Sequence, residues 1–92
     1  MTKTEKLLDK ALRNTLTIAC ENIKDKHAGF SYLTHTVNLK KPSNSLHISC
    51  FFIDELALLE ANNEQQLPLI EAQIKQQLAL INIKPQAINF SA

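Results

Sequence analysis

Lysine and arginine are the residues of this sequence whose distribution most directly suggests a chemistry. Through Lys41 the chain carries eight basic and four acidic residues, whereas the remainder carries two basic and five acidic residues. The net charge is therefore +4 in the first part and −3 in the second. A basic segment of this kind attracts polyanions. The candidate phosphate contacts are Lys3, Lys6, Lys10, Arg13, Lys24, Lys26, Lys40 and Lys41.

A solvated helix face is the alternative explanation for the first four of these cations. Glu5 and Asp9 interleave with them at helical spacing, which partly neutralises the charge of the surface. Charges of alternating sign along a helix are typical of an exposed face rather than of a binding site. The sequence leaves both interpretations open.

Catalytic motifs are absent from the sequence. A single glycine, Gly29, cannot form a glycine-rich phosphate loop, and no nucleophile elbow is present. Asp54 and Glu55 are adjacent acids, which we interpret as a helix cap and its dipole partner. His35 opposite Cys50 would supply two metal ligands, and no CxxC or HxxxH spacing supplies the others. We expect no enzymatic activity, no cofactor and no metal.

The 92 residues are expected to form one domain, 1–92, with a modest core. Five residues are aromatic and none is tryptophan, which argues against a stacking platform for single-stranded nucleic acid. The two cysteines, Cys20 and Cys50, lie among apolar residues and are expected to be small core residues, since nothing in the sequence indicates an oxidising compartment. A disulfide between them is the less favoured alternative.

We expect a soluble cytoplasmic protein that does not enter a membrane. No apolar run approaches the roughly 20 residues that a membrane span needs. The first twenty residues mix acids with bases and lack the long apolar core of a signal peptide.

The first predicted element is an amphipathic helix that begins near Thr2. Thr2 and Glu5 have the spacing of a capping box. Apolar residues then recur every three or four positions, as expected for a helix packed on a sheet; they are Leu8, Leu12, Leu16, Ala19 and Ile23. Gly29 is expected to close the helix in the left-handed conformation. A β-branched residue there should cost more stability than a typical surface change.

A β-hairpin is predicted next, with strands at 30–39 and 46–52 and a turn at 40–45. Pro42, Ser43 and Asn44 are typical turn residues. Alternate positions in both strands are mostly apolar and have polar neighbours, which indicates one buried face. These positions are Leu33, His35, Val37, Leu39, Leu46, Ile48, Cys50 and Phe52. Pairing of Leu39 with Leu46 would place His35 opposite Cys50.

Two further features of the hairpin follow from its alternation. Phe30 and Tyr32 are out of phase with Leu33, which a β-bulge would explain. The other face is polar enough to remain in water; it contains Thr34, Thr36, Asn38, His47 and Ser49. Phe51 joins this open face as a candidate contact for a partner.

The last part of the chain predicts two helices and a strand. Asp54 begins a short helix, and the helical pattern is interrupted near 62–68, where Pro68 belongs in a first turn or at a kink. One helix sharply kinked there is the alternative to two helices. A second apolar stripe follows: Ile70, Ile74, Leu78 and Ile81. A third strand at 83–90 is limited to a sheet edge or a strand start by Pro85. The fold class is α+β, helix-strand-strand-helix-helix-strand, a three-stranded sheet with helices on one face.

Several short motifs resemble the ribosome-binding factor A family. Residues 25–30, DKHAGF, resemble the family's D-P-R-x-G-F. Val37-Asn38-Leu39 and residues 46–50 resemble V-x-V and A-x-V-x-V, and residues 85–90 resemble the family's P-E-L-x-F close. The resemblance implies a type II KH-like fold, with Pro68 bending the chain where the family has an A-x-G kink.

The resemblance also implies a non-catalytic factor that binds ribosomal RNA or the small ribosomal subunit during its maturation. The eight basic residues would then contact phosphates rather than read bases. The alternative is a protein–protein module or homodimer with the same fold and without RNA binding, for which Phe51 and a strand edge are the candidate contacts.

Overall fold

The computed structural model describes residues 2–41 and 45–92; the predicted turn residues Pro42, Ser43 and Asn44 lie outside them. Six elements follow the predicted order. They are α1 (Lys3–Lys26), β1 (Phe30–Thr36), β2 (His47–Phe52), α3 (Glu55–Asn63), α4 (Gln66–Ala79) and β3 (Ala87–Ser91). The α+β class and the element order predicted from the sequence are confirmed.

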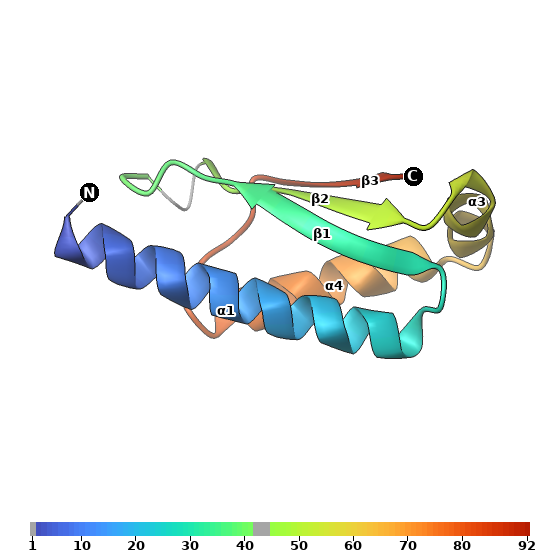
Figure 1. The fold of residues 1–92 in the computed structure, drawn as a ribbon, viewed down its shortest axis with the longest axis horizontal. Helices are drawn as coiled ribbons and strands as arrows, with labels where there is room; N and C mark the ends of the chain where they lie inside the picture. Colours follow the sequence, from blue (N-terminus) through green and yellow to red (C-terminus); the bar gives the residue numbers. More distant parts are fainter. Residues whose placement is uncertain (1, 42–44) are drawn as a thin grey trace.

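The strands form one sheet in the order β1-β2-β3, in which β2 is antiparallel to β1 and parallel to β3. Figure 1 shows α1 and α4 side by side against one face of this sheet, while α3 lies beyond one end of it. The result is an elongated molecule with principal extents of 42 × 20 × 18 Å.

The core lies between the sheet and the two long helices. Most residues of the two predicted stripes are buried: Leu12, Leu16, Ala19 and Ile23 in α1, and Ile70, Ile74 and Leu78 in α4. Leu8 is only partly buried, as is Ile81, which lies beyond the end of α4. The central strand β2 contributes Ile48, Cys50 and Phe52 from its inner face. A central strand covered on one face alternates in just this way, so the buried set follows from the sequence periodicity.

Both predicted helix starts have the expected caps. Thr2 Oγ1 accepts a hydrogen bond from the Glu5 amide at 3.1 Å, and Asp54 Oδ1 accepts one from the Ala57 amide at 2.8 Å. Each cap satisfies one of the amides that a first helical turn leaves without a partner. Asp54 thus has the structural role predicted for it.

The β-bulge is confirmed, but the predicted register is wrong by two residues. Phe30 lies opposite Phe52 and Tyr32 opposite Phe51, which leaves Ser31 as the extra residue. His35 pairs with Ile48 rather than with Cys50. β1 ends at Thr36, earlier than predicted, and beyond it the Asn38 amide donates to Ser45 Oγ at 2.8 Å instead of to a strand.

The prediction that Gly29 takes a left-handed conformation was wrong. Its φ is not positive, and α1 ends instead through the extended residue His27, whose amide donates to the Ile23 carbonyl at 2.8 Å. Gly29 is needed for a different reason: a Cβ atom placed on it would lie 2.8 Å from the Cβ of Ala57 in α3. Here glycine permits a close approach of two segments.

Among the residues that the structure describes, Gln65 and Asn82 adopt the left-handed conformation. Gln65, with φ of 58°, separates α3 from α4, whereas Pro68 lies in the first turn of α4, where its missing amide costs no hydrogen bond. The bend expected at Pro68 is therefore made by Gln65.

Asn82, also at φ of 58°, ends the turn after α4. The amides of Asn82 and Ile83 donate to the carbonyls of Ala79 and Leu78, which is a Schellman motif. Because Ile83 belongs to this closure and is buried, the third strand starts only at Ala87, later than predicted.

Candidate nucleic-acid interface

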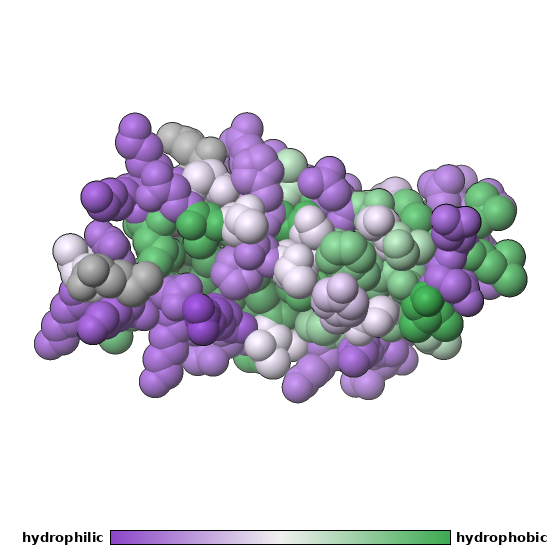
Figure 2. Space-filling view, turned by 45° about the horizontal axis from the view of Figure 1, so that its top comes forward, coloured by the Kyte–Doolittle hydropathy of each residue, from purple (hydrophilic) through white to green (hydrophobic). Residues whose placement is uncertain are grey.

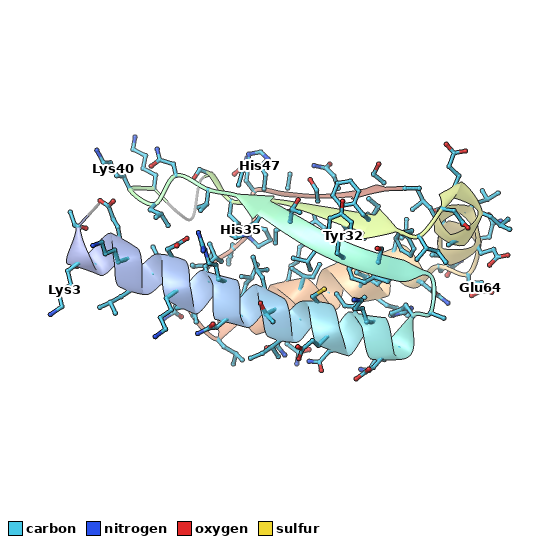
Figure 3. The ribbon with its side chains drawn as sticks, in the orientation of Figure 1. Lys3, Tyr32, His35, Lys40, His47 and Glu64 are labelled. Atoms are coloured by element: carbon cyan, nitrogen blue, oxygen red, sulfur yellow. The ribbon has the colours of Figure 1, made fainter. Side chains whose placement is uncertain are left out.

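Six of the eight predicted phosphate contacts gather at one end of the molecule. Four lie on the first half of α1 and two follow the end of β1; we call this set the basic end: Lys3, Lys6, Lys10, Arg13, Lys40 and Lys41. All six are exposed. Figure 3 shows Lys3 and Lys40 at the same end of the molecule, although the two residues are distant in sequence.

The turn that carries Lys40 and Lys41 is closed by side-chain hydrogen bonds. Asn38 Oδ1 accepts a bond from the Lys40 amide at 3.0 Å, and the Asn38 carbonyl accepts one from the Lys41 amide at 2.9 Å. The Ser45 hydroxyl donates to the Lys41 carbonyl at 2.8 Å. An Asx turn of this kind fixes the backbone locally, so the two lysines extend from a defined segment.

Two acids reduce the charge of the basic end without cancelling it. Asp9 Oδ2 lies 3.1 Å from Nε of Arg13, one turn further along α1. The Arg13 side chain is nevertheless 70% exposed, so its remaining donors face water. With Glu5 as the second acid, six cations and two carboxylates leave a net charge of +4 in this part of the surface.

Lys24 and Lys26 are not part of this cluster. α1 has 24 residues and, at about 1.5 Å per residue, is about 36 Å long, so the two lysines lie at the opposite end of the molecule. They occupy the last turn of α1, where positive charge stabilises the helix dipole. The helix α3 lies at this end of the molecule, and exposed acids on it and at its two ends reduce the positive charge around Lys24 and Lys26. These acids are Asp54, Glu55, Glu60 and Glu64.

The outer face of the sheet is open and polar, as predicted. Three rows of paired residues cross it: Tyr32–Phe51–Ser91, Thr34–Ser49–Asn89 and Thr36–His47–Ala87. Asn38, which was expected on this face, belongs to the turn instead. Among the described strand residues, those that point to this face include no carboxylate.

Phe51 lies on the open face as predicted, and it is stacked on a second aromatic ring. The ring centroids of Tyr32 and Phe51 are 4.8 Å apart, with an angle of 18° between the ring planes. Sequence reasoning missed Tyr32, because the bulge was located only approximately. The signal was present: Tyr32 shares the parity of Thr34 and Thr36.

An open groove of about 460 Å³ runs between α1 and β1 on the other side of the sheet. Arg13 lies at its rim, and His35 lines it from β1. Figure 3 shows His35 on the helix side of the sheet and His47 on the outer side. Burial lowers the pKa of His35 below its ordinary value of 6.5, the carboxylate of Asp9 opposes this shift, and Arg13 adds to it.

Acidification is expected to destabilise the fold through His35. Because its pKa is lower in the folded than in the unfolded chain, the unfolded state binds the proton first, and stability falls as the pH drops from about 6.5 downward. The midpoint of urea unfolding should therefore decrease between about pH 7.5 and about pH 5.5. His35→Gln should reduce this decrease and His47→Gln should not; the same decrease in wild type and His35→Gln would contradict the assignment.

The two cysteines, Cys20 and Cys50, differ in burial: Cys50 is buried and Cys20 is partly buried. Both are free thiols, and burial raises the pKa of Cys50 to about 12, which makes its thiol unreactive at neutral pH. Across residues 2–41 and 45–92, no cluster of three or more His, Cys, Asp or Glu residues suits a metal ion.

Comparison of the chain with protein-family models, with curated proteins and with solved structures finds no match. Within the described ranges, no helix has the length and apolar character needed to cross a membrane. A proposal of function therefore starts from the surface of this molecule and from the short motifs of its sequence.

Proposed function

We propose that this chain is a non-catalytic, cytoplasmic RNA-associated domain that holds RNA phosphates at its basic end. The observation that carries this proposal is the convergence of six exposed cations from two segments of the chain on one end of the molecule. Lysine and arginine clusters of this kind supply the sequence-independent part of nucleic-acid affinity. Figure 2 shows hydrophilic residues gathered over this end, while hydrophobic residues gather over the α3 end.

The basic end fits phosphates better than it fits base edges. Its cations are long, exposed side chains on a helix and a turn, and within 2–41 and 45–92 no polar side chain is buried that could select one base. Contacts of this kind position a nucleic acid and carry no sequence information of their own. The resemblance to the ribosome-binding factor A family, with its KH-like fold, makes ribosomal RNA in the small subunit the first target to test.

Co-sedimentation with small ribosomal subunits tests this proposal. The chain should pellet with the subunits at about 50 mM salt and dissociate substantially at about 200 mM, because counterion release makes phosphate contacts salt-dependent. Absence of co-sedimentation at the lower salt, with the chain folded, would contradict an association with the subunit.

A protein–protein module is the second candidate, and an apolar patch next to α3 favours it. This patch consists of one residue just before α3 and two on it: Ile53, Leu56 and Leu59, which are 64%, 62% and 55% exposed. It lies at the end of the molecule opposite the basic end. If this patch makes a homodimer, Leu56→Lys should yield a monomer while Leu80→Lys, at the distant end of α4, should not. A wild-type chain that sediments as a monomer at tens of micromolar would rule out the homodimer.

A further inference from the structure

Tyr32 and Phe51 form a stacked aromatic pair on the open face of the sheet, where the rings are partly in contact with water. Tyr32 is 48% exposed although it stacks on Phe51. In contrast, the other aromatic pair, Phe30 and Phe52, is edge-to-face and buried within the core. The chain thus places one aromatic pair inside and one in water.

Both outer sides of the stack are open. β1 is an edge strand, so within the described sheet no further strand covers the side of Tyr32 that faces away from Phe51. On the other side, Phe51 lies opposite Ser91 of β3, which is small and exposed. A flat aromatic ligand can therefore extend the stack, and every nucleic-acid base has such a face.

We propose that Tyr32 and Phe51 form a base-stacking platform, and that the RNA of the proposed function is single-stranded where it crosses the sheet. This inference rests on that function, because the basic end supplies the charge complementarity that selects a polyanion. Duplex RNA keeps its bases stacked on one another, whereas unpaired bases stack on aromatic side chains. The low aromatic content argues against an extended stacking surface, and the proposed platform needs only the two rings of this pair.

The rows of the open face connect the platform to the basic end. Tyr32 and Thr36 are four residues apart on β1, or about 13 Å at the usual rise of a strand, and Lys40 and Lys41 follow in the next turn. Between them lie hydroxyl, amide and imidazole groups, which are able to hydrogen-bond sugars and phosphates. The described strand residues of this path carry no carboxylate, whereas the exposed acid Glu55 lies beyond it, beside Ser91 at the α3 end.

Tyrosine fluorescence tests the platform directly, because Tyr32 is the single tyrosine of a chain without tryptophan. An unlabelled single-stranded RNA oligonucleotide should quench the emission of Tyr32 as it binds. Inorganic polyphosphate, which has no bases, and an RNA duplex of the same length should bind the basic end without comparable quenching. Binding of the single strand without any change in Tyr32 emission would overturn the platform.

Substitution provides the second measurement. Tyr32→Thr, a residue type already present in β1, should weaken binding of the oligonucleotide by about 10- to 100-fold, the range expected for one stacked base. It should leave the salt dependence unchanged, since no phosphate contact is lost. Tyr32→Phe keeps the ring and should bind like wild type; equal affinity of Tyr32→Thr and wild type, with both folded, would overturn the inference.

The outcomes separate this inference from the function on which it rests. Salt-sensitive binding of single-stranded and duplex RNA with equal affinity, and without quenching, would retain the phosphate contacts and reject the platform. Absence of binding to any RNA or to polyphosphate at low salt would reject both. The Lys10→Glu/Arg13→Glu variant should need more RNA to reach saturation and should still show quenching of Tyr32 there, because it loses phosphate contacts and keeps both rings.

Discussion

Reversing the charge of Lys10 and Arg13 together is expected to weaken RNA binding by about 100-fold at low salt. A hydrogen bond to a charged group contributes about 1.5 kcal/mol, and 1.4 kcal/mol corresponds to a tenfold change in Kd, so the loss of two such contacts gives this figure. The slope of log affinity against log salt should also become less steep, by about 0.7 per lost contact on a single strand. Fluorescence anisotropy of a labelled RNA, titrated at several salt concentrations, measures both quantities.

A matched control lies on the same helix. Lys24→Glu/Lys26→Glu changes the net charge by the same amount, but at the end of α1 that is remote from the basic end. This variant should retain most of the affinity and the salt dependence of the wild type, apart from a small loss of helix stability at the dipole. If both double variants lose the same affinity, RNA responds to total charge, and the basic end is not a site.

Replacing Gly29 with alanine is expected to destabilise the fold through a clash with Ala57. The added Cβ would lie 2.8 Å from the Cβ of Ala57, a distance that forces α3 to move, and overpacking of this kind costs about 1–3 kcal/mol. Part of this is offset because alanine lowers the entropy of the unfolded chain, an effect of about 0.4–1 kcal/mol. Valine at this position should cost more, since it adds two further methyl groups.

The double variant Gly29→Ala/Ala57→Gly isolates the clash. Ala57→Gly alone should cost about 1 kcal/mol, the usual penalty of glycine inside a helix. The double variant should be more stable than the sum of the two single effects predicts, because the colliding methyl is gone. Urea unfolding of the four proteins gives the coupling free energy, and additive effects would contradict the steric role of Gly29.

The periodic features of the fold could be predicted from the sequence. The stripes of α1 and α4 recur at helical spacing, and the inner face of β2 alternates, so the buried residues and the element order follow from local patterns. The caps at Thr2 and Asp54 were predictable for the same reason, since each depends on residues no more than three positions away.

Features that depend on contacts distant in sequence could not be predicted in this way. A register shift of two residues preserves the alternation of the hairpin, so hydrophobic pattern alone could not exclude it. The role of Gly29 depends on Ala57, which only the folded chain brings near. Glycine is the usual left-handed residue, but here Gln65 and Asn82 take that conformation because helix closure, rather than residue type, requires it.

The candidate site was predicted in its composition but not in its geometry. The list of basic residues was available from the sequence, whereas the separation of Lys24 and Lys26 from the other six depends on the length and direction of α1. The gathering of Lys40 and Lys41 beside the start of α1 depends on how β1 crosses that helix. Tyr32 was missed because one residue of uncertainty in the bulge changes the face to which it points.

The salt dependence of RNA binding by the unmodified chain tests the central claim most directly. The net charge of +4 at the basic end corresponds to about four phosphate contacts, so log affinity for single-stranded RNA should fall with log salt with a slope of about −3. The measurement needs one oligonucleotide and a series of salt concentrations from about 50 to about 200 mM. A slope near zero, or no binding at the lowest salt, would contradict phosphate recognition by this molecule.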